Sequence, residues 1–179
     1  MELSEALNNR KSTRHYIDNK VDKSLLDEML SAANLAPSWK NSQTPRFYVA
    51  TGEKSKNAVR EALPEFNRKN SENASAYIVT TVVLNRSGFD KDGTAVTEIG
   101  NGWGYYDLGL NNMALLLKAT ELGISTLVMG IRDGEKLRKE FDIPETEAVV
   151  SVIAVGYTDS EIVRPKRKSV EDFAKFYED

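Results

Sequence analysis

The sequence predicts an α+β fold in which helices pack on a small sheet. Stretches with apolar residues at helical spacing alternate along the chain with short runs of β-forming residues. Two of these runs, residues 77–84 and 148–155, are almost continuously apolar, which is typical of central strands covered on both faces. The chain has 179 residues, 40% hydrophobic and 28% charged, which indicates one globular domain spanning residues 1–179.

The N-terminal part of the chain is predicted to contain two helices. Residues 2–9 favour a short helix that ends at a pair of asparagines. Asp22 is a suitable N-cap for a second helix, which continues to Asn34 and is ended by Pro37. Its apolar residues recur at helical spacing and are Leu25, Leu26, Met29, Leu30 and Ala33.

The middle of the chain is predicted to hold a strand, a helix and the first central strand. The strand covers residues 47–50, and the helix covers residues 54–63 and is stopped by Pro64. After the strand at 77–84, residues 85–100 are polar and contain three glycines. We expect a surface loop there that acts as a lid.

A long helix is predicted from Trp103 to Leu122, with Gly123 as its C-terminal cap. Apolar residues cover most of its circumference, and a helix of this kind is usually buried. In so small a chain, one way to bury it is against a second subunit.

The last part of the chain is predicted to add two strands and a helix. We expect a strand at residues 126–131, a helix at 135–141 and the second central strand at 148–155. Residues 158–179 form a polar, basic C-terminal extension that turns helical near residues 170–177.

Composition excludes several kinds of chemistry. The chain has no cysteine, so thiolate nucleophiles and cysteine-ligated metals are excluded, and a single histidine argues against a histidine triad or multi-histidine metal site. That histidine, His15, is interpreted as structural. The net charge of −3 disfavours a nucleic-acid partner. Because no leader and no run of about 18 apolar residues is present, we expect a cytoplasmic protein without a membrane partner.

Two glycine-containing motifs lack the spacing that a ligand site requires. The glycines between Gly100 and Gly104 do not follow the G-x-G-x-x-G pattern, and no apolar strand precedes them. Asp90 opens a segment like a calcium loop, but its glycine, Gly93, stands at the fourth position instead of the sixth. We interpret both motifs as plain loops.

Basic residues alternate after the first helix. In an extended segment, the side chains of Arg10, Ser12 and Arg14 lie on one side. Two guanidinium groups and a hydroxyl suit a phosphate dianion, which takes bidentate charged donors. A solvated basic run at a helix end explains the same residues equally simply.

Two further polar segments offer binding groups. Residues 36–45 (APSWKNSQTP) carry Asn41 and Gln43, whose amides both donate and accept and can read the edge of a planar heterocycle, although a turn is the simpler interpretation. Residues 164–168 (RPKRK) supply more cations for a phosphate or a neighbouring subunit, or form only a solubilising tail.

Taken in order, these segments resemble the FMN-dependent nitroreductase family over nearly the whole chain. R-x-S-x-R follows the first helix, A-P-S-x-x-N-x-Q follows the second, and the long apolar helix ends in Leu-Gly-Ile. A Met-Gly turn at 129–130 and Val-Gly-Tyr at 155–157 complete the set. The chain departs from the family pattern at residues 43–45, where Gln-Thr-Pro replaces the frequent Gln-Pro-Trp.

The resemblance implies an α-β-α sandwich, with a small mixed sheet flanked by helices and the long helix at a dimer interface. It also implies a homodimer with two FMN sites at that interface. Arg10, Ser12 and Arg14 would hold the FMN phosphate and ribityl chain, and Arg167, helped by Lys166, would complete the phosphate site.

Other residues of the implied site surround the flavin ring. Asn41 would hydrogen-bond to the ring edge, with Gln43 also at the cofactor. Met129 and Gly130 would lie beside the ring, with backbone N–H groups near N5 and O4. The residues that would approach from the partner subunit are Pro37, Ser38 and Trp39.

The implied activity is that of an NAD(P)H-dependent flavin oxidoreductase. In a ping-pong cycle, NADH or NADPH would give hydride to FMN, and a nitroaromatic, quinone or similar electron-poor small molecule would then take the electrons. No catalytic side chain and no metal are required. Three alternatives remain open: a same-fold reductase of enones or halogenated aromatics, a protein that stores or senses FMN without turnover, and an interaction module whose motifs are coincidental.

Overall fold

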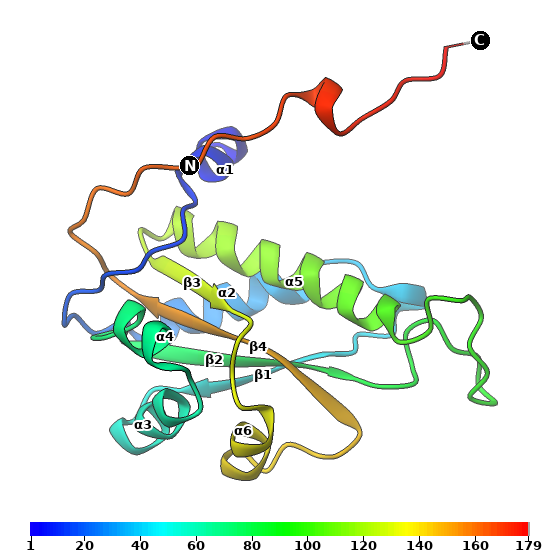
Figure 1. Ribbon diagram of the computed structural model, residues 1–179, viewed down its shortest axis with the longest axis horizontal. Coiled ribbons are helices and arrows are strands. Elements are labelled where there is room, and N and C mark those ends of the chain that lie inside the picture. Colours follow the sequence, from blue (N-terminus) through cyan, green and yellow to red (C-terminus); the bar gives the residue numbers. More distant parts are fainter. Residues whose placement is uncertain (179) are drawn as a thin grey trace.

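The computed structural model describes residues 1–178 and contains a four-stranded sheet with helices on both faces (Figure 1). The strands are β1 (Pro45–Ala50), β2 (Ala76–Val83), β3 (Ser125–Met129) and β4 (Glu147–Gly156). Their order is β1-β2-β4-β3, and every neighbouring pair is antiparallel. The predicted α+β class is confirmed. The mixed sheet implied by the resemblance is wrong, because all strand pairs of this sheet are antiparallel; the parallel pairing found in residues 1–178 is an isolated bridge between Ser12 and Thr126.

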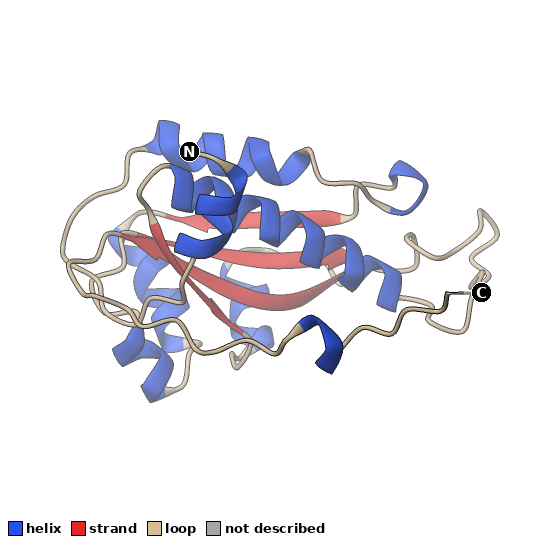
Figure 2. Cartoon of the chain, turned by 90° about the horizontal axis from the view of Figure 1, so that it is seen from above, coloured by secondary structure: helices blue, strands red, loops and turns tan. Residues whose placement is uncertain are grey.

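The helices form two layers around the sheet. Helices α2 and α5 cover one face, and α3, α4 and α6 lie on the other (Figure 1, Figure 2). The helices are α1 (Leu3–Asn9), α2 (Lys23–Asn34), α3 (Glu53–Glu61), α4 (Glu65–Asn70), α5 (Gly102–Glu121) and α6 (Gly134–Glu140). Helix α4 was not predicted, because Pro64 acts as its N-cap in addition to ending the preceding segment. Asp22 is the N-cap of α2 as predicted, although its side chain makes no capping hydrogen bond.

The two central strands are buried on both faces. In β2, Tyr77 and Val79 pack in one core with α3 and α6, whereas Ile78 packs in the other with α2 and α5. Alternate residues of a strand point to opposite faces, so an unbroken apolar run is what such a strand needs. The two-sided burial predicted for β2 and β4 is therefore confirmed.

Helix α5 is buried on one side only within the single chain. Leu108, Leu115 and Ala119 are almost fully buried against α2 and the sheet. The apolar residues that α5 leaves exposed are Tyr105, Tyr106 and Met113. The second apolar side of the helix faces outward in the single chain, and its burial against a second subunit stays a prediction.

The C-terminal extension passes the N-terminal segment, and its last part then runs away from the body of the molecule (Figure 1). Its helical content is one turn of 3₁₀-helix, η2 (Val170–Asp172), so the helix expected over 170–177 is wrong. Ser169 and Asp172 form a capping box, but the segment packs against no core and a single turn is not extended. Its large side chains are exposed and are Phe173, Phe176 and Tyr177.

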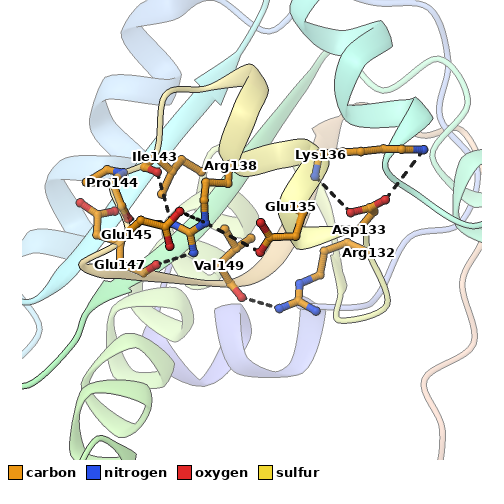
Figure 3. Close-up of polar contacts among 10 residues, drawn as sticks. All are labelled: Arg132, Asp133, Glu135, Lys136, Arg138, Ile143, Pro144, Glu145, Glu147 and Val149. Atoms are coloured by element: carbon orange, nitrogen blue, oxygen red, sulfur yellow. Dashed lines mark hydrogen bonds and ion pairs between the residues drawn. The ribbon is translucent and has the colours of Figure 1, made fainter.

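At the end of the sheet where β4 begins, one arginine of α6 and one of the loop before α6 hydrogen-bond to β4 and to the turn that precedes it (Figure 3). The Arg138 guanidinium donates to the carbonyls of Ile143, Pro144 and Glu147, and Arg132 donates to the carbonyl of Val149. These contacts satisfy carbonyls at the turn that leads into β4. None of the helices in residues 1–178 combines the length and apolarity that crossing a membrane requires.

The same end of the sheet holds a buried carboxylate. Glu147 exposes 6% of its surface and accepts hydrogen bonds from the hydroxyls of Thr81 and Tyr48, the latter at 3.0 Å. Desolvation, followed by the hydrogen bond to Glu147, raises the pKa of Tyr48 to about 12. The two hydroxyl donors satisfy a carboxylate that would otherwise be costly to bury.

Candidate cofactor site

Arginines from two distant segments converge on one pocket, which we call the cationic pocket. Its volume is about 100 Å³. The lining residues are Arg10, Lys11, Ser12 and Arg14 from the N-terminal segment, and Ile162, Val163, Arg164, Pro165 and Arg167 from the C-terminal extension. The predicted set of Arg10, Ser12, Arg14 and Arg167 is thus brought together. Lys166, which was predicted with them, does not line the pocket.

Backbone pairing with the sheet edge produces this convergence. The N–H of Thr13 donates to the carbonyl of Thr126 in β3 at 2.9 Å, and Ser12 forms a bridge with the same residue. Thr13 is 2% exposed and points inward. Because neighbouring side chains of an extended segment alternate, Thr13 points away from the pocket that Ser12 and Arg14 line, and Lys11 lines the pocket as well.

The electrostatics of the cationic pocket call for an anion. Desolvation by burial is the main cause that lowers the pKa of Arg10, and the positive charges of Arg164 and Arg167 add to it. Within residues 1–178, no carboxylate lies within ion-pair distance of these guanidinium groups or of Arg14. The Nε of Arg164 is buried and has no hydrogen-bond partner there. Unpaired, partly buried cations with free donors suit a phosphate group.

Residues 38–44 form a second polar feature, the amide loop. The loop includes a 3₁₀ turn, η1 (Trp39–Asn41), and holds Lys40, Asn41 and Gln43 at positive φ of 46°, 55° and 49°. The Ser38 hydroxyl accepts from the N–H of Gln43 at 3.0 Å, and the Gln43 amide donates to Asn41 Oδ1 at 3.2 Å. Positive φ is strained for non-glycine residues and is most often kept at functional sites.

A buried carboxylate lies beneath the amide loop. Asp107 of α5 is 2% exposed and accepts the backbone N–H of Trp39, with 3.1 Å to each carboxylate oxygen. It also accepts the Ser87 hydroxyl at 2.6 Å. Ser87 in turn lies 2.6 Å from the Ser42 hydroxyl and 3.2 Å from that of Thr44. Three segments of chain, the amide loop, the loop that contains Ser87 and helix α5, are thereby joined through the Asp107 carboxylate and the Ser87 hydroxyl.

The end of β3 is a third feature of the predicted site. The Met129 side chain is 3% exposed and belongs to the core between the sheet and α6, so only its backbone can face a ligand. Gly130 is exposed, and a Cβ there would meet no atom within 4 Å. His15 is exposed as well, with its Nε2 3.5 Å from an Asp159 carboxylate oxygen.

The amide loop and the cationic pocket do not share a cavity within one chain. Ser38 and Gln43 line a different cavity of about 180 Å³, together with Asn111 of α5. The pocket lining includes no residue of the segment 36–45. Residues 85–100 extend from the body without a named helix or strand, as predicted for the surface loop. They contact the amide loop through an ion pair of 3.5 Å between Lys40 and Asp90.

The family of the protein follows from a match over most of its length. A model of the Nitroreductase family matches residues 7–157, which include the amide loop, Asp107, the end of β3 and all of the cationic pocket's N-terminal lining. The chain belongs to the nitroreductase family.

Similar proteins agree with this assignment. The chain is 27% identical over 161 residues to a protein of Methanothermobacter thermautotrophicus whose name assigns it provisionally as an NADH dehydrogenase/NAD(P)H nitroreductase, covering 88% of this chain and 78% of the relative. A protein of Exiguobacterium sibiricum, assigned provisionally as a nitroreductase and crystallised in complex with FMN, superposes with a TM-score of 0.85 at 21% identity, covering 99% and 98% of the two chains. CLA-ER, an enone reductase of a gut-bacterial fatty acid saturation metabolism, gives 0.85 at 21% identity, covering 98% and 97%.

Membership in the nitroreductase family confirms the prediction of an oxidoreductase. FMN is the cofactor that the family uses. The fold implied by the resemblance is also confirmed by these structural neighbours.

Two features of this nitroreductase-family site were not predicted from the sequence. Arg164 lines the cationic pocket, although only Arg167 and Lys166 were selected from the basic run that contains all three. Asp107 was missed entirely. The signal that could have found it is an acidic residue within an otherwise apolar helix, because carboxylates are rarely buried without a reason.

Proposed function

We propose that this protein is an FMN-dependent NAD(P)H oxidoreductase that reduces nitroaromatics, quinones or similar electron-poor acceptors. The observation that carries the proposal is the cationic pocket of a nitroreductase-family chain, in which guanidinium groups converge without an acidic partner in residues 1–178. Such a pocket fits the phosphate of FMN in charge and in hydrogen-bond donors.

Residues of the cationic pocket bind the phosphate end of the cofactor. Arg10, Ser12 and Arg14 bind the phosphate and ribityl chain, and Arg167 closes the phosphate site, with Arg164 as an additional donor. Lys166 lies outside the pocket lining and contributes at most long-range charge.

Amide groups and backbone hold the ring. Asn41 and Gln43 hydrogen-bond to its edge, with Pro37, Ser38 and Trp39 of the same segment against the cofactor. The backbone N–H groups of Met129 and Gly130 lie beside N5 and O4. The side chain of Met129 takes no part, because it is buried in the core.

The protein's part in the reaction is binding and electrostatics. FMN held by these residues would supply the redox chemistry, with NADH or NADPH as the hydride donor and an electron-poor molecule as the acceptor. The side-chain amides and backbone N–H groups at the ring would stabilise the negative charge that reduction creates. Residues 85–100 border the acceptor and limit its access. No side-chain acid is needed, since an open site admits water as the proton source.

The site is completed by a second copy of the chain. The exposed apolar side of α5, with Tyr105, Tyr106 and Met113, supports a homodimer contact. In that homodimer the amide loop of one protomer approaches the cationic pocket of its partner. This arrangement accounts for two cofactor-binding features that lie in separate cavities of one chain.

A titration tests the proposal. Purified protein is expected to be yellow or to quench the fluorescence of added FMN with a stoichiometry near one per chain. Under anaerobic conditions NADH or NADPH should bleach the flavin absorbance, and nitro, quinone and enone acceptors should each be tested for restoring it. Protein that neither carries nor binds FMN would contradict the proposal. Protein that binds FMN but is not reduced by either nucleotide would favour storage or sensing.

A further inference from the structure

We propose that Asp107 is the positioning residue of the amide loop, holding the Asn41 and Gln43 amides where the flavin ring edge needs them. The inference rests on the proposed FMN site for its functional readout. Its structural basis is independent of the cofactor, because it lies in the hydrogen bonds of Asp107 itself.

The carboxylate of Asp107 is buried without a cation. Its partners are the N–H of Trp39 and the hydroxyl of Ser87, and no ion pair involving Asp107 is formed in residues 1–178. Burial of a carboxylate is tolerated only where hydrogen-bond donors compensate for the lost hydration. Here those donors belong to the two loops that flank the site, so the interaction fixes both loops to α5.

The hydroxyl groups of Ser42, Thr44 and Ser87 all donate toward Asp107. Ser87 has a single proton and gives it to Asp107, so it must accept from both Ser42 and Thr44. Thr44 is fully buried and Ser87 is 1% exposed. Both ends of the amide loop therefore converge on Asp107, through the N–H of Trp39 at one end and through Ser87 at the other.

The backbone of α5 is shaped for this contact. Gly104 lies one turn before Asp107 on the same side of the helix. A Cβ at Gly104 would lie 2.8 Å from Val82 Cγ2, and 3.9 Å from both Ser87 Cβ and Thr44 Oγ1. The glycine lets the first turn of α5 approach the strand end and both loops closely, which brings the carboxylate within reach of its donors.

The amide loop needs such an anchor because its conformation is not self-supporting. Three non-glycine residues at positive φ persist only where the surroundings over-determine them. The side-chain hydrogen bonds inside the loop, from the Gln43 N–H to Ser38 Oγ and from the Gln43 amide to Asn41 Oδ1, are exposed. The backbone bonds inside the loop close its 3₁₀ turn only. The Lys40–Asp90 ion pair is exposed too and contributes little. The buried contacts that fix the loop are those to Asp107 and Ser87.

The only two tryptophans of the chain give a direct readout of loop position. Trp39 follows the anchored N–H, and its ring centroid lies 4.7 Å from that of Trp103 at an interplanar angle of 48°. Rings at this distance and tilt give an exciton couplet in circular dichroism. The couplet reports whether Trp39 stays in place and does not depend on enzymatic turnover.

The test compares Asp107→Ala with Glu147→Ala, which removes the other buried carboxylate with hydroxyl donors, bonded to Tyr48 on the opposite face of the sheet, where α3 and α6 pack. Asp107→Ala is expected to abolish the couplet and to raise the FMN dissociation constant about tenfold. Asp107→Asn can accept from Trp39 through Oδ1 and donate to Ser87, whose own proton then turns toward Ser42 or Thr44, so it should keep the couplet and bind FMN within about threefold of the wild type. Glu147→Ala should lower thermal stability but leave the couplet and FMN affinity unchanged.

Retention of both the couplet and wild-type FMN affinity in Asp107→Ala would overturn the proposal, whatever happens to its melting temperature. If Asp107→Ala does not fold, Ser87→Ala takes its place, with a weaker couplet and about a threefold loss of FMN affinity expected. An unchanged Ser87→Ala would then overturn it. Loss of the couplet in a protein whose wild type binds no FMN would support the positioning role and refute the proposed function, so the two failures can be told apart.

Discussion

At the scale of one residue, Arg10 shows that a binding site for an anion carries an unfavourable free energy in the unliganded chain. Its pKa is lowered first by desolvation and then by the positive charges of Arg164 and Arg167, so the charged form is disfavoured in the folded protein. A phosphate in the cationic pocket adds an attraction that outweighs the desolvation and the repulsion between the guanidinium groups. The same guanidinium is therefore unfavourable in the free protein and favourable once an anion is bound.

Substitution of Arg10 by alanine should separate binding from stability. Losing charge-assisted hydrogen bonds to phosphate, worth roughly 1.5–3 kcal/mol, should weaken FMN binding about 10- to 100-fold. The melting temperature of the FMN-free variant should not fall, because a repelled charge has been removed. Fluorescence titration and thermal melts measure the two effects. The control is Lys23→Ala, which removes an exposed cation of α2 paired with Asp27; equal loss of FMN affinity in both variants would show that the cationic pocket is not the phosphate site.

At the scale of elements, α5 ends through the conformation of a single glycine. Gly123 has φ of +72°, its N–H donates to Thr120, and the following N–H of Ile124 donates to Ala119 at 2.8 Å. These bonds satisfy carbonyls at the helix end and turn the chain toward β3. A Cβ at Gly123 would meet no atom within 4 Å, so the glycine is needed for its backbone and not for space.

Gly123→Ala should consequently destabilise the protein by about 1 kcal/mol, the cost of a left-handed conformation for an ordinary residue. Gly123→Asn should cost less, because asparagine tolerates this region better than alanine does. Urea unfolding with an unchanged slope and a shifted midpoint measures both. A variant order in which alanine is as stable as glycine, or more stable than asparagine, would be inconsistent with this role.

The spacing of apolar residues predicted those helices and strands whose buried faces are encoded within the element itself. The spacing of apolar residues in α2 and the unbroken runs of β2 and β4 encode which faces they bury, and the structure places them accordingly. The alternation of Arg10, Ser12 and Arg14 was sufficient for the same reason, since an extended segment fixes its own sides. Asp107 could not be found this way, because its role depends on segments brought together only by the tertiary fold.

At the scale of the whole molecule, the two parts of the proposed site do not meet within one chain. The cationic pocket is separate from the cavity that the amide loop lines. Apolar side chains are exposed on α5 and along the C-terminal extension, which departs from the body (Figure 1). Apolar surface of this extent is more typical of subunit contacts than of a monomer. A two-fold homodimer would both cover it and join each pocket to the partner's loop.

Mixing two defective variants tests this arrangement. Arg10→Ala damages the pocket and Asn41→Ala damages the loop, so each homodimer has two impaired sites. If every site combines the pocket of one protomer with the loop of its partner, a mixed dimer has one doubly impaired site and one with both parts intact. After unfolding and refolding together, about a quarter of all sites should bind FMN with wild-type affinity, as random pairing requires. Sites built within single chains would give no such recovery, since no chain in the mixture carries both intact parts, and a titration showing only weak binding would mean that the amide loop serves its own protomer.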